Sequence, residues 1–194
     1  MGKPAAVLLT PGAGGSADHA TLVAIEEGLT PLPVRRHDFA YRRAGKKAPP
    51  RAPRLVAELF DDLPAIADEL AVSTGELVIG GRSMGGRICS MAVAEGLDVA
   101  GLVLLSYPLH PPGKPDNLRV EHFDRVSVPC LFVSGDNDPF GSPAEFGRHL
   151  PALGGPVESV FLEGGRHDPK NRAQVAAIVA AVSDWVAGLG ELNR

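Results

Sequence analysis

Residues 80–87, with the sequence Gly80-Gly81-Arg82-Ser83-Met84-Gly85-Gly86-Arg87, decide the fold of this chain. The short apolar run Leu77–Ile79 precedes this stretch, and a segment compatible with a helix follows it. In a Gly-x-Ser-x-Gly turn, the glycines on either side of the serine remove side chains that would clash where a strand bends sharply into a helix. The stretch therefore predicts a strand, a tight turn and a helix, with the Ser83 hydroxyl exposed at the tip of the turn.

Short apolar runs recur along the rest of the chain, and helix-compatible segments lie between them. This alternation is typical of a parallel sheet wound with crossover helices. The predicted strands are Ala5–Leu9, Pro33–Asp38, Leu77–Ile79, Leu102–Ser106, Leu131–Ser134 and Val157–Leu162, and the predicted helices are Ala17–Gly28, Arg54–Ala71, Met84–Glu95, Pro143–Leu150 and Asn171–Ala187. The fold class is therefore α/β, a doubly wound and mostly parallel sheet of about six strands with helices on both faces. Val157–Leu162 alternates more than the other strands, which places it nearer an edge.

The composition is that of an ordinary globular protein. The chain has 194 residues, 44% of them hydrophobic and 22% charged, and a formal net charge of −4. This length fits a single domain, residues 1–194, with one large core that needs no disulfide. The two cysteines, Cys89 and Cys130, fall in a predicted helix and at the start of a predicted strand, so we expect buried free thiols.

The same composition bears on location and partners. The negative net charge argues against nucleic acid as the main partner. The apolar run near the N-terminus is too short for a signal-peptide core, and no stretch is expected to be long enough to cross a membrane. We therefore expect a cytoplasmic protein with no membrane partner, and the sequence leaves its oligomeric state open.

Two segments interrupt the alternation of strands and helices. Residues 35–54 contain eight basic residues and three prolines, which predicts a solvated loop, with an anion site for acidic substrates or RNA as the alternative. Residues 107–117 contain four prolines and follow the carboxyl end of a predicted strand. Ligand-facing loops lie at that end in open α/β sheets, so His110 is a candidate for lining the site.

A serine hydroxyl becomes a nucleophile only with a general base, usually a histidine that a carboxylate orients. Asp136 and Asp138 follow the fifth predicted strand, and His167 and Asp168 follow the sixth. Of the six histidines, only His167 lies in a glycine-flanked loop after the final strand, so it is the expected base. Asp168 is a weak candidate for the carboxylate, because neighbouring residues on an extended loop point apart, and Asp136 can serve simply as a turn residue.

Attack on a carbonyl also creates an oxyanion that needs hydrogen-bond donors. The expected donors are the backbone N–H groups of Met84, directly after Ser83, and of Ala13, in the glycine-rich loop after the first strand. Gly12 and Arg82 are their neighbours and candidate lining residues. That loop could instead cradle a phosphate, but it lacks the glycine spacing of nucleotide-binding loops. The histidines are scattered and no paired-cysteine spacing occurs, so we expect no metal and no cofactor.

Together these motifs resemble those of small α/β-hydrolases without a lid. They are Pro11-Gly12-Ala13-Gly14-Gly15-Ser16, the Ser83 turn, Gly135-x-x-Asp138-Pro139-Phe140 and Gly165-x-His167. The resemblance runs from Val7 to Trp185. It is shared with dienelactone-hydrolase-like proteins and with the hydrolase-like domain of a subunit of the nonspecific-lethal chromatin complex. In this comparison the chain begins at the third strand of the family fold, and it has Pro11-Gly12 where the family often has His-Gly.

The resemblance implies a role for each site residue. Ser83 would be the nucleophile, His167 the base, and Asp138 the carboxylate that orients His167, since Asp138 matches the Gly-x-x-Asp placement of the family and Asp136 does not. The implied activity is that of a carboxylesterase or thioesterase, which cleaves a small-molecule ester or thioester through an acyl-enzyme on Ser83. Because a fold does not guarantee its chemistry, the alternative is a catalytically inactive protein that uses the hydrolase fold for binding or as a scaffold.

Overall fold

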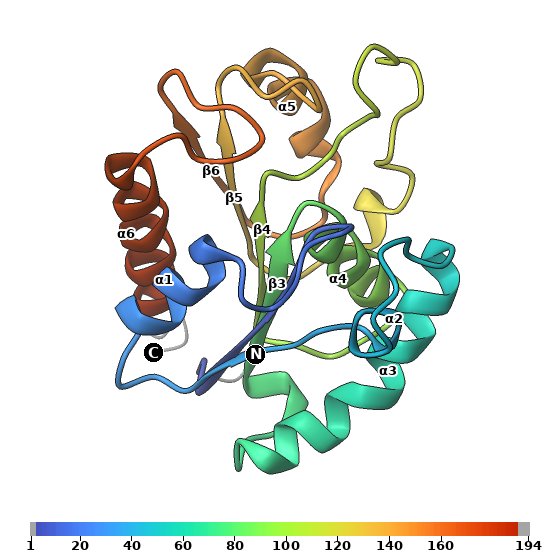
Figure 1. The fold of residues 1–194 in the computed structure, drawn as a ribbon, viewed down its shortest axis with the longest axis vertical. Coiled ribbons are helices and arrows are strands. Elements are labelled where there is room, and N and C mark those ends of the chain that lie inside the picture. The colour runs from blue at the N-terminus through green and yellow to red at the C-terminus, as the bar shows by residue number, and fades with distance from the viewer. Residues whose placement is uncertain (1–2, 190–194) are drawn as a thin grey trace.

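The computed structural model describes residues 3–189, in which six strands form one all-parallel sheet in the order β2-β1-β3-β4-β5-β6 (Figure 1). The strands are β1 Ala6–Thr10, β2 Val34–Arg36, β3 Leu77–Arg82, β4 Gly101–Leu105, β5 Cys130–Gly135 and β6 Val157–Leu162. The helices are α1 Ala20–Gly28, α2 Ala40–Arg43, α3 Ala52–Glu69, α4 Met84–Ala94, α5 Pro143–His149 and α6 Arg172–Leu189. This arrangement confirms the predicted α/β fold class.

Helices cover both faces of the sheet because the strands are apolar on both faces. Along β1, Ala6 and Leu8 belong to a core cluster with side chains of α3 and α4, whereas Val7 and Leu9 belong to a second cluster with side chains of α1 and α6. Figure 1 shows these two pairs of helices on opposite sides of the strands. Every residue of β1 and β4 is buried, which explains why their sequences are continuous apolar runs rather than alternating ones.

The strand ends differ from the prediction mainly at β3, while β6 lies at an edge as expected. β3 continues three residues beyond Ile79 and ends at Arg82. Glycine has a low strand propensity, but here Gly80 and Gly81 pair in register with Val103 and Leu104 of β4. The tertiary pairing therefore carries the strand up to the residue before Ser83.

The prediction of one solvated loop over residues 35–54 was wrong in part. This stretch contains the end of β2, the four-residue helix α2 and the first turn of α3. Four residues are too few to show a helical period, and Pro53 stands in the first turn of α3, where a proline needs no hydrogen-bond partner. Some of its basic side chains form ion pairs, such as Arg36 with Asp18 and Glu26 at 2.8 and 2.7 Å.

α6 corrects the expectation that no stretch of the chain is long enough to cross a membrane. With 18 residues and a mean hydropathy of 1.2, it is the one helix in the described part of the chain that is long and apolar enough to cross a membrane, so the expectation that no stretch has this length was wrong. Its buried side chains, which include Ile178, Val182 and Trp185, pack in the core cluster between the sheet and α1. This is the arrangement of a helix that packs on a sheet through one apolar stripe.

Both cysteines are buried free thiols, as predicted. Cys89 lies on α4 and Cys130 begins β5. Burial raises the pKa of each thiol to about 12, because a thiolate is poorly solvated in the core. Both therefore stay protonated at neutral pH and cannot act as nucleophiles.

Candidate active site

The carboxyl ends of β1 and β3 form the crevice that holds the candidate site. β1 is followed by β2 on one side and has β3 on its other side, so the loops after β1 and β3 leave in opposite directions. Ligands in open α/β sheets bind at such a switch point. A cavity of about 440 Å³ lies there, lined by Ser83, His167, Ala13 and Met84 together with three arginines and an apolar wall.

Ser83 occupies a strained turn between β3 and α4. Its φ of 52° and ψ of −114° place a non-glycine residue in a region that costs about 1–3 kcal/mol. The Ser83 N–H donates to the carbonyl oxygen of Leu105 at 2.8 Å, and this bond ties the turn to the end of β4. The side chain therefore stands at the carboxyl edge of the sheet, as the Gly-x-Ser-x-Gly pattern predicts.

Gly81 and Gly85 allow this turn to pack closely on the end of β1. A Cβ atom on Gly81 would collide with the carbonyl oxygen of Thr10. A Cβ atom on Gly85 would lie 2.6 Å from the carbonyl oxygens of both Thr10 and Pro11. The motif therefore needs glycine at both positions because two backbone segments approach each other there.

Replacing Gly85 by alanine is expected to lower the free energy of unfolding by about 1–3 kcal/mol, the usual cost of overpacking. The matched control is Gly147→Ala on α5, where a Cβ atom meets nothing within 4 Å and alanine favours the helix. Urea denaturation of the two variants and the unchanged protein measures the difference. Equal stability of Gly85→Ala and the unchanged protein would show that the turn has room for a methyl group.

His167 lies between Ser83 and Asp138 and is hydrogen-bonded to both. Its Nε2 is 2.9 Å from Ser83 Oγ, and its Nδ1 is 2.8 Å from Asp138 Oδ2. The Asp138 side chain is only 1% exposed, and its Oδ1 accepts a hydrogen bond from the Phe140 N–H at 2.9 Å. The Phe140 ring stacks on the imidazole with ring centres 4.1 Å apart. The histidine is thereby oriented to take a proton from the serine hydroxyl.

The other two aspartates of these loops do not contact the His167 ring. Asp136 accepts a hydrogen bond from the Asn137 side chain at 2.7 Å, as a turn residue does. Asp168 instead forms an ion pair with Arg82, with Asp168 Oδ1 at 2.5 Å from Arg82 Nη2. The same guanidinium nitrogen donates to the His167 carbonyl oxygen at 3.2 Å. Arg82 thus joins the turn before Ser83 to the loop that carries His167.

Two residues that line the cavity near Ser83 have backbone N–H groups without a protein acceptor in the described part of the chain. Met84 is the first residue of α4, so its N–H has no acceptor within the helix. The Ala13 N–H donates to no protein acceptor within residues 3–189. Both residues line the cavity. Donors placed in this way can stabilise an oxyanion.

The remaining predicted lining residues are placed differently. Arg82 lines the cavity, whereas Gly12 borders it: a Cβ atom on Gly12 would lie 3.4 Å from Ser83 Cβ. The prediction that His110 lines the site was wrong, because His110 does not line this cavity. Its ring is buried, and its Nε2 lies 3.2 Å from Glu145 Oε1 of α5. Pro108 lines the cavity in its place.

Sequence reasoning missed several lining residues. Pro49 and Pro50, from the segment that was predicted to be solvated, form an apolar wall together with Leu55 of α3. Arg87 and Arg119 add two positive charges. The sequence could have predicted Arg87 as a lining residue, because positions four apart lie on the same face of a helix and Arg87 comes four residues after Ser83. Arg119 had none, since its place depends on the path of an irregular segment.

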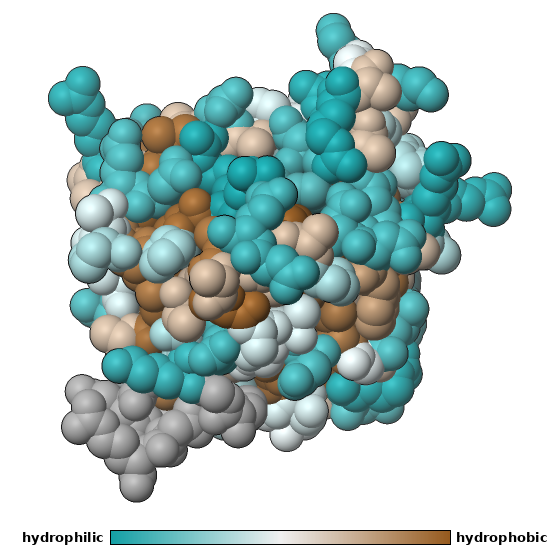
Figure 2. All heavy atoms as spheres, turned by 90° about the horizontal axis from the view of Figure 1, so that it is seen from below, coloured by the Kyte–Doolittle hydropathy of each residue, from teal (hydrophilic) through white to brown (hydrophobic). Residues whose placement is uncertain are grey.

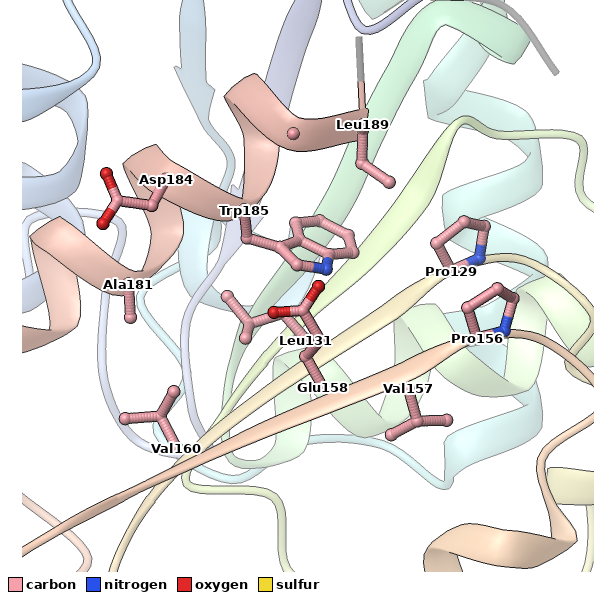
Figure 3. A pocket seen from close by; sticks show the side chains of 11 residues that line it. Pro129, Leu131, Pro156, Val157, Glu158, Val160, Ala181, Asp184, Trp185 and Leu189 are labelled. Atoms are coloured by element: carbon pink, nitrogen blue, oxygen red, sulfur yellow. The ribbon is translucent and has the colours of Figure 1, made fainter. Parts of the chain in front are cut away.

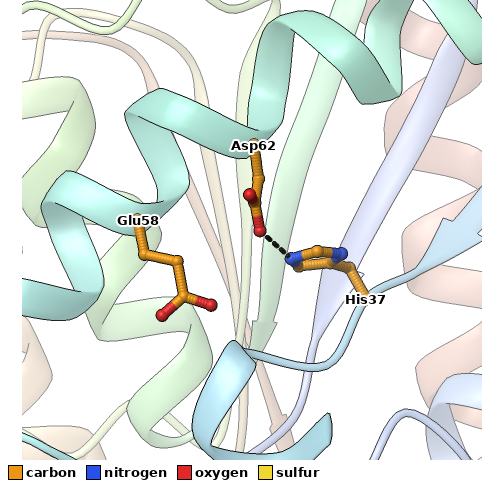
Figure 4. Close-up of side chains that lie close together, drawn as sticks. All are labelled: His37, Glu58 and Asp62. Atoms are coloured by element: carbon orange, nitrogen blue, oxygen red, sulfur yellow. Dashed lines mark ion pairs between the residues drawn. The ribbon is translucent and has the colours of Figure 1, made fainter.

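A cluster of potential metal ligands lies elsewhere, between the end of β2 and α3 (Figure 4). His37, Glu58 and Asp62 have ligand atoms within 4.8 Å of one another. The guanidinium of Arg43 is close to all three, with Nη2 at 3.4 Å from Asp62 and 3.8 Å from Glu58, and Nη1 at 3.3 Å from His37 Nε2. This positive charge offsets part of the negative charge of the two carboxylates, so the cluster forms an ion-pair network. The expected absence of a metal stays a prediction.

A second cavity, of about 480 Å³, lies between α6 and the last two strands (Figure 3). Pro129 and Pro156, which precede β5 and β6, place it at the amino ends of these strands, away from Ser83. Trp185 and Leu131 give it an apolar floor, with Glu158 and Asp184 as its charged residues. Figure 2, which views the molecule from below, shows hydrophobic atoms exposed among polar ones on that side. Its lining residues in the described part of the chain include no serine, cysteine or histidine.

A serine, a histidine and an aspartate hydrogen-bonded in this order, at the carboxyl edge of a doubly wound parallel sheet, define the class of α/β-hydrolase-fold proteins. The family comparison agrees, because a model described as "Alpha/beta hydrolase domain" matches residues 3–185. The chain belongs to this family.

Solved structures of similar fold come from several bacteria. A dienelactone hydrolase from Anabaena variabilis has a TM-score of 0.75 at 18% identity, over 96% of this chain and 87% of that one. Est1E from Butyrivibrio proteoclasticus has a TM-score of 0.72 at 16% identity, over 97% and 89%. An alpha-beta serine hydrolase homologue from Coxiella burnetii has a TM-score of 0.68 at 17% identity, over 96% and 85%. At these identities the similarities establish the fold alone.

Proposed function

We propose that the protein is a serine hydrolase that cleaves a carboxylic ester or thioester through an acyl-enzyme on Ser83. The observation that carries this proposal is the unbroken hydrogen-bonded chain from Ser83 Oγ through His167 to Asp138. A structural serine needs neither a histidine at 2.9 Å nor a buried carboxylate behind that histidine. The resemblance to dienelactone-hydrolase-like proteins supports the same reading of the residues.

The first half of the proposed reaction forms the acyl-enzyme. Ser83 Oγ attacks the carbonyl carbon while His167 Nε2 takes the hydroxyl proton, and Asp138 stabilises the resulting imidazolium. The N–H groups of Ala13 and Met84 stabilise the oxyanion. When the tetrahedral intermediate collapses, the bond to the alcohol or thiol breaks, and His167 returns its proton to that leaving group. The acyl group then stays on Ser83 as an ester.

The second half releases the acid. His167 takes a proton from a water molecule, which attacks the acyl carbonyl, and then returns the proton to Ser83 Oγ as the acid leaves. Est1E has been solved with ferulic acid bound, a carboxylic acid and hence a member of the product class that ester hydrolysis yields. We further propose a small-molecule substrate and a cytoplasmic setting, on the grounds of composition set out above.

A fluorophosphonate probe tests the proposal, because it reacts only with an activated serine. The unchanged protein is expected to be labelled at Ser83, which mass spectrometry of the tryptic peptide locates, and Ser83→Ala is expected to lose all labelling. Ser106→Ala is a matched control, since Ser106 is another serine at positive φ at the end of a strand, outside the cavity. Labelling that persists in Ser83→Ala would falsify the assignment of the nucleophile.

The competing function is that of an inactive binding protein or scaffold, suggested by the resemblance to a subunit of a chromatin complex. The same experiment separates the two. A scaffold would leave Ser83 unlabelled although the protein is folded, as circular dichroism would confirm. The intact hydrogen bonds of the site favour the enzyme, because a decayed site has no reason to keep Asp138 buried against His167.

A further inference from the structure

Three arginines line the cavity beside Ser83, but only one of them has an anionic partner. Arg82 pairs with Asp168 at 2.5 Å. The side chains of Arg87 and Arg119 form no ion pair and no hydrogen bond with any residue among 3–189. The Nε atom of Arg87 is buried and has no hydrogen-bond partner. Both side chains are half-buried, and two guanidinium groups without an anionic partner at one cavity form a candidate site for an anionic group.

Arg87 is held on the same helix as the nucleophile. Its N–H donates to the Ser83 carbonyl oxygen at 3.1 Å, the first turn of α4. Residues four apart share one face of a helix and are separated by roughly 6 Å along the axis. The backbone of Arg87 therefore lies about one helical turn beyond Ser83, and Arg87 lines the same cavity.

Arg119 approaches from the segment after β4, and two backbone hydrogen bonds fix its position. Its N–H donates to the Leu109 carbonyl oxygen at 2.8 Å, and its own carbonyl oxygen accepts from the buried Tyr107 hydroxyl at 2.8 Å. Burial and the positive charge of Arg87 lower the pKa of Arg119, against smaller effects of Tyr107 and Glu121 that raise it. The two arginines line the same cavity, where their positive charges repel each other, and Glu121 forms no ion pair with either of them among residues 3–189.

We infer that the cavity accepts an ester or thioester carrying a second group, a free carboxylate, which Arg87 and Arg119 bind while Ser83 attacks the ester carbonyl. This inference rests on the proposed function for its reaction. A carboxylate offers two oxygens, enough for both guanidinium groups, and removes their mutual repulsion on binding. Pro49, Pro50 and Leu55 supply an apolar wall for the carbon chain between the two ends. The cavity, of about 440 Å³, has room for a short dicarboxylic chain.

Matched ester pairs test the inference by turnover. Monomethyl glutarate and dimethyl glutarate differ by one carboxylate on the acyl side, and 4-acetoxybutyrate and its methyl ester differ by one on the alcohol side. Acid release is measured by chromatography. The unchanged protein is expected to favour the anionic member of at least one pair by about tenfold to a hundredfold in kcat/KM. Hydrolysis of both members of both pairs with equal kcat/KM would refute the inference and leave the proposed function standing.

Variants assign the preference to the arginines. Arg87→Gln and Arg119→Gln are each expected to reduce the anionic-to-neutral ratio of kcat/KM by about tenfold. Arg125→Gln is the control, because Arg125 is exposed, pairs with Asp124 and lies outside the cavity, so its ratio is expected to stay that of the unchanged protein. An unchanged ratio in both Arg87→Gln and Arg119→Gln would contradict the assignment. Circular dichroism and thermal melts identify a variant that has not folded, and Arg119→Lys then provides a milder change.

A binding measurement separates this inference from the proposed reaction. Calorimetric titration of glutarate into Ser83→Ala protein needs no turnover, and glutarate is expected to bind. Adding Arg119→Gln to Ser83→Ala is expected to raise the Kd about tenfold, whereas adding Arg125→Gln leaves it unchanged. Binding without turnover of any ester by the unchanged protein would support the anion site and overturn the hydrolase. Turnover without preference or binding would overturn the anion site alone.

Discussion

Replacing His167 by alanine is expected to lower kcat for an ester by about four to six orders of magnitude. The imidazole is the only base within hydrogen-bond distance of Ser83 Oγ among residues 3–189, so its loss leaves the hydroxyl with water as its proton acceptor. Steady-state hydrolysis of p-nitrophenyl acetate, corrected for the spontaneous rate, measures the fall. The loss should be in kcat rather than in KM, because the imidazole acts on the transition state.

His149→Ala is the matched control for this loss. His149 ends α5 and does not line the cavity, so its removal is expected to leave kcat within about twofold of the value for the unchanged protein. A His167→Ala protein that retains more than about a hundredth of kcat would contradict the assigned role, since general-base catalysis alone contributes about 10²–10⁴-fold.

The second large effect concerns stability. Replacing Phe132 by alanine is expected to lower the free energy of unfolding by about 3–5 kcal/mol. Phe132 lies on β5, is 1% exposed, and contacts the rings of Tyr107, Phe123 and Phe146 at centroid distances of 5.6, 6.2 and 5.8 Å. Truncation removes these contacts and opens a cavity in the core cluster on that face of the sheet. Chemical denaturation measures the loss.

Phe132→Leu provides the comparison, because leucine keeps most of the buried volume. Its expected cost is under about 1.5 kcal/mol. If Phe132→Ala cost no more than Phe132→Leu, the four rings would not form a tightly packed unit. A large loss of unfolding free energy for Phe132→Ala alone would show that this aromatic cluster contributes strongly to the stability of the core on that face of the sheet.

Local motifs made much of the site predictable. The spacing around Ser83 encodes a strand, a turn and a helix over a few residues, and steric limits leave little choice of conformation there. The order of Asp138 and His167 after successive strands placed both at one edge, because parallel strands all end on the same side. The structure brings these two side chains to Ser83, and their assigned roles stay predictions until the variants are measured.

What the sequence left open depends on contacts between distant segments. The prediction placed His110 at the site because of its loop alone, whereas its ring lies against Glu145, which is 35 positions later in the chain. The wall formed by Pro49 and Pro50 depends on how residues 35–54 fold back over the sheet edge, and prolines indicate only that a regular element is interrupted. Arg119 lies in irregular structure, where no period relates a residue to its neighbours in space.

The backbone at Ser83 carries one more consequence, for how such a site persists in evolution. Glycine adopts a positive φ without the steric cost that serine bears at 52°, so Ser83→Gly relieves strain that the folded chain otherwise carries. Selection for stability alone would favour glycine at this position, since nothing in the turn requires a side chain. Under the proposed function, serine is kept here for its hydroxyl at a cost in stability, and family members that do not need the hydroxyl are expected to carry glycine at this position.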